Sequence, residues 1–123
     1  MLCFNLLAFM YINVMLLFRD HEFNSYRVVG GINVYLLFAF LGAFLFELIN
    51  LITGSSIQGP VPLTGKDKDY SEYIYYSLTS LTTVGYGDYI PVNRPARMLS
   101  VFLSSVGMLF PAIIIARLVS LVK

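Results

Sequence analysis

Apolar residues fall into three long runs along the chain, and polar segments separate these runs. The run Ile32–Ile52 holds 21 residues with one charged side chain. As an α-helix it would span about 31 Å, which matches the hydrocarbon core of a bilayer. The run Arg97–Val122 is interrupted only by Arg117 and is long enough to cross a bilayer with tilt. The pattern therefore predicts two membrane-crossing helices, over residues 31–53 and 96–122.

The first run, Leu2–Phe18, is shorter, at 17 residues, and would span about 25 Å as a helix, near the lower limit for crossing a bilayer. It lacks the basic start and the small-residue cleavage site of a signal peptide. It also lacks the row of Lys or Arg that is typical of a helix lying in the membrane interface. The pattern therefore favours a helix that crosses the membrane over one that lies in the membrane interface. Residues 1–30 are thus expected to form an additional hydrophobic helix and a polar connector, Arg19–Arg27.

The segment between the two long runs has a different composition. Residues 54–69 contain three glycines, two prolines and four consecutive charged residues, which predicts an exposed loop. Residues 70–82 regain helical character, and Asp69 with Glu72 resembles a capping box. This helix would be only about 19 Å long, too short to cross a bilayer. A short helix followed by glycine-rich backbone at membrane depth is tolerated where it lines a watery cavity, which indicates a re-entrant pore loop.

Composition narrows the functional classes. Hydrophobic residues make up 58% of the 123-residue chain and charged residues 12%, so the excess apolar surface is expected to face lipid. The net charge of +1 provides no footprint for nucleic acid. The sequence carries no phosphate loop, metal cluster or nucleophile–base pair, so we predict neither an enzyme nor a bound cofactor. It has no helix with Arg at every third position, so we expect no voltage sensor.

Residues Thr82–Asp88 read TTVGYGD, and this motif resembles the selectivity filter of tetrameric potassium channels. On its own, Gly-Tyr-Gly-Asp is also typical of an ordinary turn, but here it follows a short helix and lies between two crossing helices. One departure from the family is Ser80, where many members have threonine. The resemblance covers roughly residues 32–122 and implies a pore domain over residues 31–123, with an outer helix 31–53, a turret 54–69, a pore helix 70–82, a filter 83–88 and an inner helix 96–122.

The resemblance implies that K⁺ is the permeant ion and is bound in the filter. Backbone carbonyls of Thr83, Val84, Gly85 and Tyr86, with the Thr83 hydroxyl, would replace its hydration shell. Successive carbonyls can face one axis only if the backbone alternates between right- and left-handed conformations, and Gly85 and Gly87 reach the left-handed region at low cost. One filter segment cannot surround an ion, so the resemblance implies a homotetramer.

Further residues are expected to support this filter. In the family, the acidic residue after the filter, here Asp88, commonly bonds to an aromatic donor on the pore helix. By alignment that donor is Tyr75, with Tyr76 as the second candidate; plain aromatic packing is the alternative for both. The position that often holds glutamate or valine behind the filter is Thr79, so no carboxylate pair is expected. The expected supporting set is Tyr75, Tyr76, Thr79, Ser80, Thr82 and Asp88.

The inner helix carries candidates for a gate. Gly107 lies twenty positions after Gly87, where the family often has a hinge glycine, although glycine in membrane helices also serves close packing. Pro111 removes a helical hydrogen bond, which predicts a bend. Pro111, Ile115 and Val119 recur at helical spacing and are expected to face an aqueous cavity.

Together these features predict an all-α, multi-pass membrane protein of the plasma membrane that serves as a subunit of a potassium-selective channel. The sequence shows no regulatory domain, so we expect either a minimal pore or the pore portion of a longer channel. Two rival functions are a nonselective cation channel and a scaffold subunit that does not conduct. The intact TTVGYGD motif argues against both.

Overall fold

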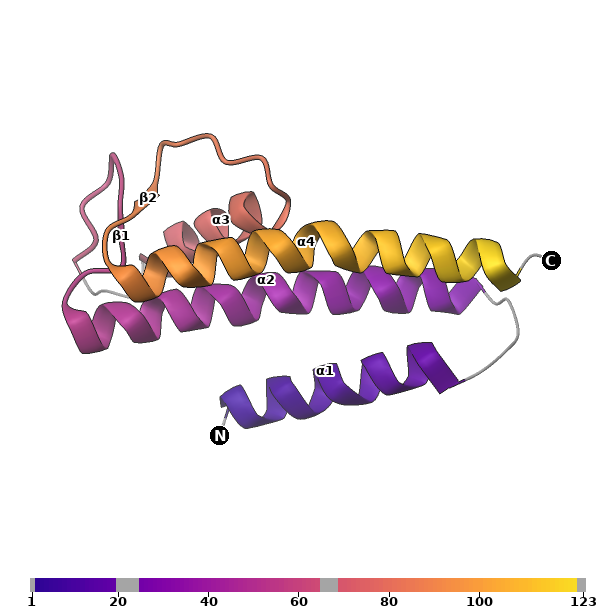
Figure 1. Ribbon diagram of the computed structural model, residues 1–123. Coiled ribbons are helices and arrows are strands. Elements are labelled where there is room, and N and C mark those ends of the chain that lie inside the picture. Colours follow the sequence, from indigo (N-terminus) through magenta and orange to yellow (C-terminus); the bar gives the residue numbers. More distant parts are fainter. Residues whose placement is uncertain (1, 20–24, 65–68, 122–123) are drawn as a thin grey trace.

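The computed structural model describes residues 2–19, 25–64 and 69–121. They form four helices and a two-stranded antiparallel pairing, namely α1 (Leu2–Arg19), α2 (Ser25–Thr53), β1 (Ile57–Gln58), α3 (Tyr70–Leu81), β2 (Ile90–Pro91) and α4 (Arg94–Leu121). The long helices α2 and α4 run side by side in opposite directions, and the short α3 lies against both (Figure 1). The prediction of an all-α fold is confirmed.

Helices α2 and α4 are both long and apolar enough to cross a membrane. Helix α2 begins at Ser25, six residues before the expected start, so the end of the predicted polar connector is helical. Gly31 lies inside α2, where an added Cβ would meet the Ile114 side chain of α4 at 2.9 Å. A glycine at position 31 therefore allows the close approach of α2 and α4.

Helix α1 contacts α2 and leaves large apolar side chains exposed, among them Phe4, Tyr11 and Met15. Its 18 residues form one helix without interruption. Whether this helix crosses the bilayer stays a prediction. Residues 20–24 of the expected connector and 65–68 of the expected turret lie outside the described residues.

The core lies where α2, α3 and α4 meet. Gly42 of α2 makes this packing feasible, because an added Cβ would lie 2.7 Å from a methyl of Leu103 in α4 and closer still to the Ser77 hydroxyl of α3. That hydroxyl donates to the backbone carbonyl of Ala39, at 2.6 Å. Small residues on α2 thus let the pore helix approach its backbone directly, as small residues do between membrane helices.

The helix starts differ from the sequence-based expectation. Asp69 has helical backbone angles, φ −77° and ψ −14°, and makes no capping hydrogen bond, so the predicted capping box with Glu72 is wrong. A cap residue needs extended backbone angles to turn its side chain onto the first N–H groups. Asn93 has the capping role at α4: its Oδ1 accepts the Ala96 N–H at 2.9 Å. Its Nδ2 also donates to Thr53 Oγ1 at 2.7 Å, which ties the start of α4 to the end of α2.

The predicted turret loop is also partly ordered by pairing. Ile57 pairs with Pro91 and Gln58 with Ile90, while the Val92 N–H donates to the Ser56 carbonyl at 2.9 Å. These bonds join the segment before the pore helix to the segment after the TTVGYGD motif. The motif is therefore held at both ends, by α3 and by this short ribbon.

Candidate functional site

The chain between α3 and β2 contains the TTVGYGD motif and arches away from the helices (Figure 1). Its backbone has positive φ at alternate residues: 59° at Thr83, 53° at Gly85 and 79° at Gly87. Val84 and Tyr86, which lie between them, have negative φ. The left-handed glycines were expected from the sequence, whereas Thr83 was not. A β-branched residue is rarely left-handed, and this conformation costs roughly 1–2 kcal/mol, so neighbouring groups must hold Thr83 in place.

A helix normally leaves its last four carbonyls unpaired, but every carbonyl in the last turn of α3 accepts a hydrogen bond. The Leu78 carbonyl accepts both the N–H and the hydroxyl of Thr82, at 2.9 and 2.7 Å. The Thr79 carbonyl accepts the Gly85 N–H at 3.2 Å. The backbone of the motif is thus bonded directly to the helix that precedes it.

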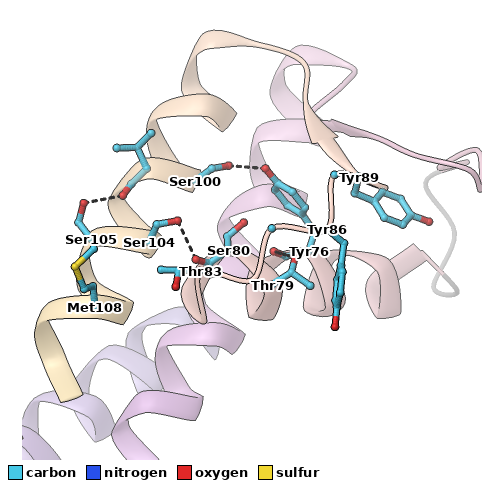
Figure 2. Close-up of a pocket in the computed structure, with 13 residues that line it drawn as sticks. Tyr76, Thr79, Ser80, Thr83, Tyr86, Tyr89, Ser100, Ser104, Ser105 and Met108 are labelled. Carbon is cyan, nitrogen blue, oxygen red and sulfur yellow. Dashed lines mark hydrogen bonds between the residues drawn. The ribbon is translucent and has the colours of Figure 1, made fainter. Parts of the chain in front are cut away.

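The other two carbonyls of this turn are reached from the long helices. The Ser80 carbonyl accepts the Thr83 N–H at 3.1 Å and the Ser104 hydroxyl of α4 at 2.8 Å (Figure 2). The Leu81 carbonyl accepts the Tyr35 hydroxyl of α2 at 3.2 Å. Sequence reasoning missed Tyr35 and Ser104. For Ser104 a usable signal was the recurrence of serine at helical spacing in the mainly apolar α4, at residues 100 and 104.

At the other end of the motif, Asp88 is bonded to α3 through Tyr75. The Tyr75 hydroxyl donates to Asp88 Oδ2 at 2.7 Å, and Asp88 Oδ1 accepts the Tyr89 N–H at 3.0 Å. The hydrogen bond to Asp88, together with burial and the carboxylate charge, raises the pKa of Tyr75 to about 12.

Tyr76, the other aromatic candidate, lies elsewhere. Its hydroxyl shares a 2.8 Å hydrogen bond with Ser100 (Figure 2), and its ring packs edge-on against Phe46. Neighbouring side chains on a helix point about 100° apart, so one of the two tyrosines faces Asp88 and the other faces the core. Of the remaining supporting residues, Thr79 turns its hydroxyl back to the Tyr76 carbonyl at 3.0 Å.

A cavity of about 410 Å³ opens between the motif and α4 (Figure 2). Hydroxyl-bearing side chains line much of it, from Thr79, Ser80, Thr83, Ser100, Ser104 and Ser105. The motif itself is open to the outside of the single chain: Val84 is 51% exposed and Tyr86 is 73% exposed. The rest of the single chain therefore leaves these two side chains of the motif uncovered.

The predicted gate residues lie along α4. Gly107 is buried against the end of α3, and an added Cβ would lie 2.6 Å from the Leu81 carbonyl carbon and closer still to its oxygen. This contact accounts for the glycine by close packing, while its role as a hinge stays a prediction. Helix α4 continues through Pro111. Ile115 and Val119 are exposed in the single chain, and the cavity that they are expected to face stays a prediction because it would form between subunits.

Comparison with known proteins agrees with this geometry. The sequence profile of a family described as "Ion channel" matches residues 26–123. The chain is 30% identical over 87 residues to "Two pore potassium channel c" of Oryza sativa subsp. japonica. The aligned segment covers 67% of this chain and 19% of that protein. It is 47% identical over 34 residues to "Potassium channel K2" of Plasmodium berghei (strain Anka). That aligned segment covers 28% of this chain and 2% of that protein.

The chain therefore spans a small part of the length of these two curated relatives. No solved structure matches it significantly. The family match covers α2, α3, the TTVGYGD motif and α4, and the two long apolar helices fit a protein of the membrane. The chain belongs to the ion channel family.

Proposed function

We propose that this chain is a subunit of a potassium-selective channel that conducts K⁺ passively through a homotetrameric pore. The observation that carries the proposal is the alternation of positive φ at Thr83, Gly85 and Gly87. This alternation turns successive carbonyls towards one side of the backbone, which a ring of ion ligands requires. The names of both curated relatives include "potassium channel", which supports K⁺ as the permeant ion.

In this proposal the carbonyls of Thr83, Val84, Gly85 and Tyr86, with the Thr83 hydroxyl, take the place of water around K⁺. Carbonyl oxygens compensate for the lost hydration when their number and spacing suit the ion. The hydrogen bonds at the two ends of the motif, to the last turn of α3 and from Tyr75 to Asp88, would keep that spacing constant. K⁺ is the transported ion, and no resident cofactor takes part.

Four identical chains around one axis would complete each ring of carbonyls, with closed cyclic symmetry. The exposure of Val84 and Tyr86 in the single chain supports this assembly, because neighbouring subunits would cover them. We place the channel in the plasma membrane, where a K⁺ gradient can drive conduction, with α2 and α4 crossing the bilayer.

The test is a flux assay on purified protein in liposomes, run first with a K⁺ gradient and then with a Na⁺ gradient. We expect flux with K⁺ and little with Na⁺. Equal flux of both ions would indicate a nonselective cation channel. No flux from protein that is assembled would indicate a scaffold subunit.

Assembly is measured separately, by the mass of the detergent-extracted protein and by density on its symmetry axis. We expect a tetramer with ions beside residues 83–86. A stable monomer or dimer in a native-like membrane would contradict the proposed pore, because the filter would then be incomplete.

A further inference from the structure

Two side chains from different membrane helices meet at the inner end of the motif. The hydroxyls of Tyr35 in α2 and Ser104 in α4 donate to consecutive carbonyls, those of Leu81 and Ser80, at 3.2 and 2.8 Å. The other carbonyls of this turn are bonded by the motif itself. The last turn of α3 is thus anchored from both sides by groups that lie far from it in the sequence.

The Ser104 hydroxyl of α4 has a different kind of acceptor from the hydroxyls of Ser100 and Ser105. Ser100 and Ser105 donate to the carbonyls four residues earlier in their own helix, at 2.8 and 2.9 Å, which is the usual way for a membrane helix to satisfy a serine. Ser104 instead donates across to α3. The geometry of Ser104 therefore serves a contact between elements rather than its own helix.

The Ser80 carbonyl links Ser104 to the motif. It accepts the Ser104 hydroxyl and also the N–H of Thr83, at 3.1 Å. Thr83 is the residue with the unfavourable φ of 59°. A carbonyl held in place from α4 thus holds the backbone of the residue that most needs support.

Tyr35 is oriented by its own surroundings. Its ring stacks on Phe110 of α4, with centroids 6.3 Å apart and planes at 25°, so the hydroxyl is directed by packing between α2 and α4. The Leu81 carbonyl that accepts it is also the group against which Gly107 packs. Any shift of this last turn would break one of these contacts.

We propose that Tyr35 and Ser104 are positioning residues that hold the inner end of the filter, at Thr83, in its conducting conformation. This inference rests on the proposed function. Without the two hydroxyls, the last turn of α3 loses its hydrogen bonds to α2 and α4, and the Ser80 carbonyl holds Thr83 less firmly in its left-handed conformation. The Thr83 carbonyl and hydroxyl then leave the innermost ion site, and both conduction and discrimination against Na⁺ fall.

The test compares Tyr35→Phe and Ser104→Ala with the wild type in planar bilayers, by single-channel open duration and by the K⁺/Na⁺ permeability ratio. Each change removes a hydroxyl and keeps most of the packing. Loss of a neutral hydrogen bond corresponds to about a five-fold change in an equilibrium, so we expect open duration to shorten by about five-fold or more. Ser104→Thr, which keeps a hydroxyl, should restore much of it.

Matched controls are Tyr26→Phe in α2 and Ser120→Ala in α4, since both residues are exposed. We expect these controls to conduct like the wild type. Thermal stability and tetramer mass are measured on every variant. If Ser104→Ala does not assemble, Tyr35→Phe decides, because it retains the stacked ring.

Tetrameric Tyr35→Phe and Ser104→Ala with unchanged open duration and permeability ratio would overturn the inference, as would equal losses in the controls. Lowered thermal stability with unchanged permeation would overturn it as well, because the two hydroxyls would then serve only folding. A wild-type protein that passes Na⁺ as well as K⁺ would contradict the proposed function instead.

Discussion

The contact between Gly107 and the end of α3 makes Gly107→Ala the most informative single substitution. An added methyl would lie 2.6 Å from the Leu81 carbonyl carbon, whereas ordinary contact begins at 3.4 Å. Because the carbonyl oxygen of Leu81 would lie closer still, the two helices must part by more than about 0.8 Å. The obstacle is backbone, and Leu81 is fully buried, so rotation of a side chain cannot relieve the clash.

The size of the effect follows from two opposing terms. Overpacking of a well-packed core costs typically 1–3 kcal/mol, and an immovable backbone neighbour favours the upper end of that range. Replacing a helical glycine by alanine stabilises the helix by roughly 1 kcal/mol, because alanine has the higher helix propensity. We expect a net loss of about 2 kcal/mol per chain. A separation of this size would lengthen the Ser104–Ser80 hydrogen bond, now 2.8 Å, beyond hydrogen-bonding distance.

The assay is thermal unfolding of the detergent-extracted protein, followed by K⁺ flux in liposomes. Gly107→Ala should melt at a lower temperature and conduct less. The matched control is Gly30→Ala, at a helical glycine of α2 where an added Cβ has no atom within 4 Å, and it should be neutral or slightly stabilising. If Gly107→Ala is as stable as the wild type but gates differently, the hinge interpretation holds and the packing argument is refuted.

Three further predictions concern the filter and its outer end. Gly87→Ala meets no steric obstacle, but at φ 79° the added Cβ costs roughly 1–2 kcal/mol per chain in the left-handed region. Conduction or K⁺/Na⁺ discrimination should therefore be lost in flux assays, and unchanged selectivity would contradict the filter assignment. Tyr75→Phe removes the donor to Asp88 and should alter open duration in single-channel records while ion preference survives, whereas Tyr76→Phe should leave Asp88 unaffected; the reverse pattern would show that the wrong tyrosine is assigned. Ultraviolet titration should find tyrosines that ionise late, because the pKa of Tyr75 is raised from 10 to about 12, and burial with nearby Glu72 likewise raises the pKa of Tyr89 to about 12. The neutral hydroxyl is the favoured form, so the Tyr75 bond contributes in full below pH 10 and is lost as the pH rises through about 12. Tyr75→Phe should therefore remove one late transition from the titration.

Local features of this protein could be predicted from the sequence because they depend on nearby residues. The two long apolar runs predicted α2 and α4, since the length of a crossing helix follows from bilayer thickness. The left-handed conformations of Gly85 and Gly87 were also predictable, because glycine is the residue that adopts them at low cost. The start of α3 was not predicted correctly: Asp69 has the composition of a cap, but its backbone lacks the geometry.

The bonds that hold the motif were decided by the tertiary structure. The alignment favoured Tyr75 over Tyr76 as the donor to Asp88, but it is the rotation of α3 against α2 and α4 that directs Tyr75 to Asp88 and Tyr76 to Ser100. Thr83 is left-handed although its residue type disfavours that conformation. Tyr35 and Ser104 reach the end of α3 across 46 and 24 residues of sequence. Periodicity and residue type determined which segments form helices and where a filter could lie. Contacts between distant segments depend on how the helices pack, and local preferences do not encode that packing.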